Sequence, residues 1–108
     1  MRAALATALG ARAALVFADD AGAVAAVQAA RDSGMVVLVI ESAVVALDRA
    51  MLIAAIGPLA QQLAPATRLV ALDLAEGARE MDVVAAAEYL ASAQSTTGQV
   101  LRITGAQG

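Results

Sequence analysis

Five residue types are missing from this sequence of 108 residues: cysteine, histidine, tryptophan, lysine and asparagine. Without cysteine and histidine the chain has no disulfide, no thiol nucleophile, no Ser-His-Asp triad and no ordinary zinc site. Without lysine the phosphate-binding loop G-x-x-x-x-G-K-[ST] is impossible, and no G-x-G-x-x-G dinucleotide fingerprint occurs either. We therefore expect no metal and no cofactor.

Basic charge is scarce and scattered. All seven basic residues are arginines that stand singly, and the formal net charge is −3, so no nucleic-acid partner is expected. The longest uncharged stretch, residues 50–67, contains two prolines, a glycine and two glutamines. A membrane-spanning helix needs about 20 predominantly apolar residues, so we expect no contact with a membrane. Because the N-terminus has no signal-peptide pattern, we predict a cytoplasmic protein.

Small apolar side chains are abundant instead. Hydrophobic residues make up 61% of the chain, and alanine alone fills 31 positions. This composition is sufficient for a folded core and is typical of one small domain, which we assign to residues 1–108. A domain of this size has a narrow margin of stability, which favours association with a partner.

Apolar runs alternate with helical patterns along the chain. The run Met35–Ile40, MVVLVI, is apolar throughout and rich in β-branched residues, which is typical of a strand buried on both faces. Similar patterns predict strands at 13–18, 68–72 and 99–104, and helices at 2–11, 21–32, 42–63 and 80–92. The alternation predicts an α/β fold: a parallel sheet of about four strands, joined by right-handed crossovers and flanked by helices on both faces.

Five segments, taken in order, carry a family resemblance. They are ALVFADDAG at 14–22, ALDRAMLIAAIGPLAQQLAP at 46–65, RLVAL at 68–72, VVAAAEYLAS at 83–92 and TGQVLRI at 97–103. They resemble the L-V-N-N-A-G strand, the active-site helix ending in L-A-x-E-L-A-P, and the last strands and helix of short-chain dehydrogenases/reductases, especially 3-oxoacyl-ACP reductases. The resemblance implies the C-terminal half of a Rossmann-like doubly wound fold. It begins at the family's fourth strand, without the glycine-rich turn that binds the cofactor.

The resemblance also shows that the catalytic positions have changed. In the family a Tyr acts as acid and base, a Lys four residues later assists it, a Ser orients the carbonyl and an Asn supports a proton relay. The matching positions hold Val45 for the Tyr and Arg49 for the Lys, Ser42 is the candidate remnant of the Ser, and no Asn exists. The loops that wall the substrate pocket are reduced to a few residues. The resemblance therefore implies a truncated, catalytically degenerate chain, a pseudoenzyme of the oxidoreductase family.

Ordinary structural roles are expected for several polar side chains. Asp19, Asp20 and Ser42 stand where they would cap helix N-termini, and Arg49 is expected to be a solvated or interface charge beside Asp48. Three methionines, at positions 35, 51 and 81, are expected in the core.

Three functions are open at this point. The leading one is a non-catalytic structural or oligomerisation partner, either of itself or of a catalytically active short-chain reductase, because the helices and strand that build the family's tetramers are retained. The second is a binding module for an acyl thioester or a nucleotide, with its mouth at residues 18–20 and 40–42. The third is a reductase half that a partner chain completes.

Overall fold

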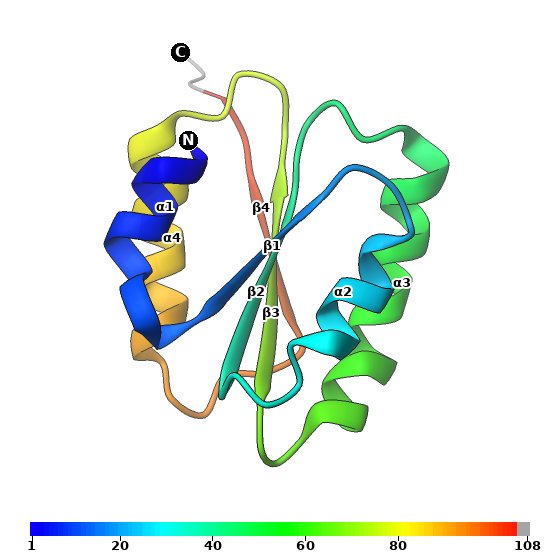
Figure 1. The fold of residues 1–108 in the computed structure, drawn as a ribbon. Helices are drawn as coiled ribbons and strands as arrows, with labels where there is room; N and C mark the ends of the chain where they lie inside the picture. The colour runs from blue at the N-terminus through cyan, green and yellow to red at the C-terminus, as the bar shows by residue number, and fades with distance from the viewer. Residues whose placement is uncertain (106–108) are drawn as a thin grey trace.

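Four parallel strands alternate with four α-helices in the computed structural model, which describes residues 1–105 (Figure 1). The strands are β1 (Ala14–Ala18), β2 (Met35–Ile40), β3 (Arg68–Leu74) and β4 (Gln99–Ile103), and they lie in the order β1-β2-β3-β4. The helices are α1 (Arg2–Leu9), α2 (Ala23–Ala29), α3 (Ala46–Leu63) and α4 (Glu80–Ser92), with the short 3-10 helix η1 (Gly10–Arg12) before β1. The predicted α/β class and Rossmann-like half are confirmed, and positions 106–108 of the predicted domain lie outside the described residues.

Helices cover both faces of the sheet, which explains why β2 is apolar throughout. Alternate residues of a strand point to opposite faces. The even-numbered side chains of β2 pack with α2 and α3, and the odd-numbered ones pack with α1 and α4 (Figure 1). All six residues are therefore buried.

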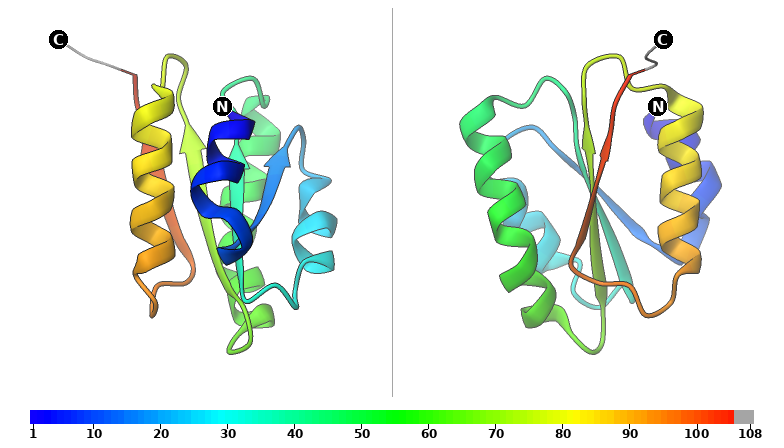
Figure 2. Two further views of the ribbon diagram at one scale, coloured as in Figure 1. Left: turned by 60° about the vertical axis from the view of Figure 1, so that its left-hand side comes forward. Right: turned by 180° about the vertical axis from the view of Figure 1, so that it is seen from behind.

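The connection through α4 has the opposite hand to the two before it. All three connections step in the same direction across the sheet, yet α2 and α3 lie on one face and α4 on the other (Figures 1 and 2). Two right-handed crossovers are thus followed by a left-handed one. The prediction of right-handed crossovers is wrong for this last unit, although about 98% of parallel crossovers are right-handed. On its own face α4 packs beside α1, so the two helices together cover that side of the sheet.

Arg68, the first residue of β3, ties the end of α4 to the sheet. Its guanidinium donates to the main-chain oxygens of Ala93 at 2.8 Å, Ala91 at 3.2 Å and Leu90 at 3.3 Å. The last carbonyl groups of a helix have no partner within the helix and carry a partial negative charge, so a cation there satisfies both needs.

Several predicted boundaries shift in the structure. Helix α1 ends at Leu9, because Gly10 adopts a φ of 52°, a conformation that favours glycine. Helix α3 begins at Ala46 rather than at residue 42, since the chain first turns so that Val44 is buried. Strand β3 continues to Leu74, two residues beyond its predicted end.

Candidate functional site

The carboxyl ends of the four strands meet at one end of the sheet, where open α/β sheets place their sites. The chain leaves the sheet there at Asp19 and Asp20 after β1, at Glu41 and Ser42 after β2, and at Ala75 after β3. The parallel register places the ends of neighbouring strands side by side. Two features lie at this edge: a small cavity on the side of α1 and α4, and an ion-pair network on the side of α2 and α3.

The cavity is small and largely apolar. It has a volume of about 170 Å³, and Phe17, Val39 and Leu74 line it from three strands, with Arg2 and Ser42 among its polar walls. Sites for drug-sized ligands have volumes of about 300–1,000 Å³. This cavity can therefore hold only a small group, not a nucleotide.

Arg2, the first residue of α1, spans the ends of β1 and β2 beside the cavity. Its guanidinium carbon lies 4.5 Å from the centre of the Phe17 ring, and Nη2 donates to Oε2 of Glu41 at 2.7 Å. A second carboxylate, that of Asp19, lies 3.8 Å from the same nitrogen. These groups are exposed, so each contact contributes at most about 1 kcal/mol.

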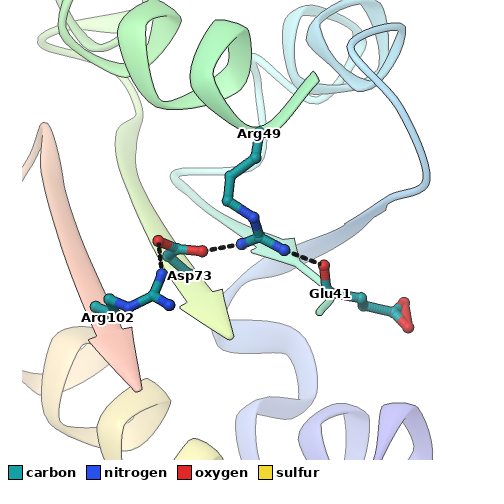
Figure 3. A network of polar contacts seen from close by, with 4 residues as sticks. All are labelled: Glu41, Arg49, Asp73 and Arg102. Atoms are coloured by element: carbon teal, nitrogen blue, oxygen red, sulfur yellow. Dashed lines mark hydrogen bonds and ion pairs between the residues drawn. The ribbon is translucent and has the colours of Figure 1, made fainter. Parts of the chain in front are cut away.

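A buried carboxylate organises the other side of the edge (Figure 3). Asp73 lies near the end of β3 with only 6% of its side chain exposed, and each of its oxygens meets an arginine. Oδ1 pairs with Arg49 from the first turn of α3, and Oδ2 accepts a hydrogen bond of 2.8 Å from Arg102 of β4. Arg49 also donates through Nη2 to the main-chain oxygen of Glu41 at 2.7 Å, while the Glu41 carboxylate points away (Figure 3).

The network is suited to holding the strand ends together. A buried carboxylate without a partner would cost several kcal/mol, and the two arginines supply the counter-charges that offset this cost for Asp73. The arrangement connects β3, β4, α3 and the turn after β2.

The three sequence-predicted site residues lie close in the chain but differ in surroundings. Ser42 lines the cavity, and Arg49 belongs to the Asp73 network. Val45 is the N-cap residue of α3, is exposed, and carries no polar side-chain atom. Arg49 is not a solvated charge beside Asp48, because only 18% of its side chain is exposed and its partner is Asp73; the alternative of an interface charge stays a prediction.

Two other local predictions have mixed outcomes. Neither Asp19 nor Asp20 caps α2, whose N-cap is Gly22, although Asp20 accepts a hydrogen bond of 2.8 Å from the N–H of Gly22 in the turn before the helix. Ser42 does not cap α3, because that helix begins four residues later with Val45 as its N-cap.

Of the three methionines expected in the core, Met35 is buried, whereas Met51 and Met81 lie exposed on α3 and α4.

Asp73 was not among the predicted site residues, although the sequence contains a signal for it. It is the single charged residue in the stretch LVALDL, at 69–74, which is otherwise apolar. A carboxylate in a buried strand needs a partner. The partners, however, come from α3 and from the neighbouring strand, where the register sets Asp73 beside Arg102. Register and helix placement appear only in the folded chain.

Helix α3, which begins near the carboxyl end of the sheet, has an exposed apolar face. Leu47 and Met51 are 71% and 52% exposed, and Ala54 and Pro58 continue the row toward the end of the helix. Steps of three or four residues place all four on one side of a helix. We call these four residues the α3 outer face. Contiguous exposed apolar patches can serve as interaction sites.

Metal ligation and membrane insertion find no support in the described part of the chain. Residues 1–105 contain no group of three or more His, Cys, Asp or Glu side chains that could hold a metal ion. Within the same range no helix is both long and apolar enough to cross a bilayer.

Comparison with known proteins gives one informative result. The family model described as short chain dehydrogenase-like protein matches residues 1–103, from α1 to the end of β4. No curated protein and no solved structure matches the chain significantly.

Proposed function

The chain belongs to the short chain dehydrogenase-like family, and within it we propose a non-catalytic protein that acts as a structural and oligomerisation partner. Its partner is a second copy of itself or a catalytically active short-chain ketoreductase. The observation that carries the proposal is the engagement of Arg49, at the position matched to the family's Lys. Asp73 and the Glu41 carbonyl hold its guanidinium, and Val45 stands where the family has its Tyr.

The proposed loss of catalysis is supported by the lack of a tyrosine or lysine side chain at the strand ends of the described residues. Valine cannot replace the phenol of a tyrosine, and a paired guanidinium differs from a lysine in shape and acidity. Tyr89, the one tyrosine of the chain, is exposed near the end of α4. Because α4 starts beside the carboxyl end of β3, Tyr89 lies toward the opposite end of the sheet.

The proposed partner surface is the α3 outer face. The resemblance described above implies that active relatives assemble through the corresponding helix. Burial of one large apolar side chain from water contributes about 1.5–3 kcal/mol, so Leu47 and Met51 together supply a useful share of a binding energy. No charged residue occurs between Arg49 and Arg68, so the part of α3 from Met51 onward can approach another helix without burying an ion of its own.

A binding module for an acyl thioester or a nucleotide is less well supported. The cavity volume of about 170 Å³ is below the usual range for such ligands. Arg2 in the cavity wall is already paired with Glu41 and Asp19, whose carboxylates would compete with a phosphate group for it. A fluorescence titration with NADPH tests this alternative, and saturable binding by the chain alone would favour it.

Light scattering tests the oligomerisation proposal. The chain is measured alone and mixed with an active 3-oxoacyl-ACP reductase, and a mass above that of the free components is expected in at least one sample. Met51→Glu places a charge on the α3 outer face and is expected to lower the mass of the complex, because association through this face is lost. Met81→Glu, at a similarly exposed methionine on α4, is the matched control and is expected to leave it intact. A monodisperse monomer in every sample contradicts the proposal.

An activity assay tests the non-catalytic part separately. The chain alone, supplied with NADPH and an acetoacetyl thioester, is expected to give no reduction. Turnover by the chain alone contradicts the proposal, whereas turnover that appears only with a partner chain favours the completed reductase half.

A further inference from the structure

Strand β1 forms an edge of the sheet that carries no protection against pairing. Its sequence ALVFA is entirely apolar, and four of its five residues are only half-buried. The opposite edge strand, β4, exposes the polar side chains of Gln99 and Arg102. Natural proteins use charged and polar side chains to prevent an edge strand from pairing with another chain. The edge of β1 is therefore the one that accepts a further strand.

The surroundings of β1 leave room for such a strand. In Figure 1 the strand lies in the foreground between α1 and α2, and neither helix crosses in front of it; the first view of Figure 2 shows it likewise between them. Ladder hydrogen bonds join β1 to β2 on one side. The N–H and C=O groups on its other side face outward and need a partner or water.

The sequence around β1 is complementary to itself in the antiparallel direction. When two copies overlap over all five residues, Val16 lies at the centre, opposite Val16 of the second copy. Leu15 then faces Phe17 of the other copy, an aliphatic–aromatic pair that favours sheet formation. The same register sets Arg12 opposite Asp20, once at each end, because a twofold axis repeats every contact.

Both members of this charge pair are available for it. Arg12 lies in η1 and Asp20 follows the end of β1, and both are exposed. Arg12 donates from Nη2 to the oxygen of Ala8 at 2.8 Å, which leaves most of its five N–H donors for another partner. Asp20 uses Oδ1 for the N–H of Gly22, and its second oxygen can accept from Arg12 of the second copy.

We infer that β1 pairs antiparallel with β1 of a second copy of this chain, centred on Val16, and forms one continuous eight-stranded sheet. The twofold axis is perpendicular to the sheet, so α1 of one copy lies on the same face of the sheet as α1 of the other copy. The two α2 helices likewise share the opposite face. Each face then continues its helical layer without a change of side. The inference rests on the proposed oligomeric role, but it uses β1 rather than the α3 outer face, so each surface can fail alone.

Single cysteines test the register directly, because the chain has none of its own. In the proposed pair the Cβ atoms of the two residues 16 lie about 4.5–5.5 Å apart, close to disulfide geometry. The two residues 14 are offset by four positions, about 14 Å. Under mild oxidation Val16→Cys is expected to give a covalent dimer on a non-reducing gel, and Ala14→Cys is not. Equal crosslinking of both variants, or of neither, overturns the inference.

Charge reversal supplies a second test that does not alter β1 itself. Arg12→Glu and Asp20→Arg are each expected to raise the dimer dissociation constant about tenfold in sedimentation equilibrium, because each turns two attractive contacts into repulsive ones. The double variant R12E/D20R is expected to return within about threefold of the original value. Loss of dimer in the double variant, with circular dichroism showing an intact fold, overturns the inference. A Met51→Glu variant that still crosslinks through Val16→Cys supports the β1 pair as a contact independent of the α3 outer face, whereas loss of the crosslink in this variant with an intact fold overturns it.

Discussion

Asp73 is the residue on which the conformation of the strand ends depends. Its carboxylate lies inside the fold, between an arginine of α3 and an arginine of β4. The same arginine of α3 reaches the carbonyl group of Glu41, the first residue after β2. Arg49 thereby joins the first turn of α3 to β3 and to the end of β2.

Removal of the Asp73 carboxylate is expected to destabilise the fold strongly. Asp73→Ala leaves the largely buried Arg49 without a counter-charge, and we expect the free energy of unfolding to fall by about 2–4 kcal/mol. Arg102→Ala removes a partner whose side chain is 56% exposed, so its cost is expected to be about 0–1 kcal/mol. Urea unfolding monitored by circular dichroism measures both. Equal midpoint shifts for the two variants would contradict this division of roles.

The residue-level prediction failed at this network for a physical reason. A sequence shows that Asp73 follows an apolar strand, and the strand was accordingly expected to end at Leu72. What keeps Asp73 within the strand is the pair of arginines supplied by other elements. Such partners depend on register and on helix docking, which composition and periodicity do not determine.

At the scale of elements, the strands were more predictable than the helix ends. Strand β2 has the predicted bounds, because the six residues between Gly34 and Glu41 are all apolar, which is typical of a strand buried on both faces. The start of α3 was predicted four residues early, since Ser42 resembles a cap while Val44 in fact anchors the turn. The left-handed crossover through α4 was missed because hydrophobic patterns give the face of a helix, not the hand of its connection.

Glycine positions give an element-level prediction with a matched control. Gly77, in the loop between β3 and α4, has a φ of 86°, and an added methyl group would lie 3.7 Å from Cα of Gly105. Gly77→Ala is expected to lower the free energy of unfolding by about 1–2 kcal/mol, because the strained backbone conformation must be kept or the loop must shift. Differential scanning calorimetry measures the change in melting temperature.

Gly57 provides the opposite case within a helix. It lies in α3, and no described atom is within 4 Å of the place of an added methyl group beyond its own helix and neighbours. Gly57→Ala is expected to change the free energy of unfolding by less than about 0.5 kcal/mol, because the smaller loss of backbone entropy is opposed by the contact of the added methyl group with the ring of Pro58. A loss of stability at Gly57 as large as that at Gly77 would contradict this difference between the two positions.

For the molecule as a whole, the two sides of the sheet have separate clusters of buried side chains that share β2 and β3. Every residue of β2 and all but the first of β3 are buried, whereas β1 and β4 are buried mainly at their last residue. The centre of the sheet is therefore the part that opens only when the whole fold opens, and the edges can open alone.

Amide hydrogen exchange is expected to reveal this order and its dependence on assembly. In dilute solution the amides of β2 and β3 should exchange most slowly, and those of β1 at least about tenfold faster, because an edge strand can separate without loss of the core. Pairing of β1 between two copies would remove that edge, so its protection should rise with protein concentration while that of β4 stays constant. The Arg12→Glu variant, which weakens the pair, should need about tenfold more protein to reach the same protection of β1. Protection of β1 that is high and independent of concentration would mean that the strand needs no partner to be stable.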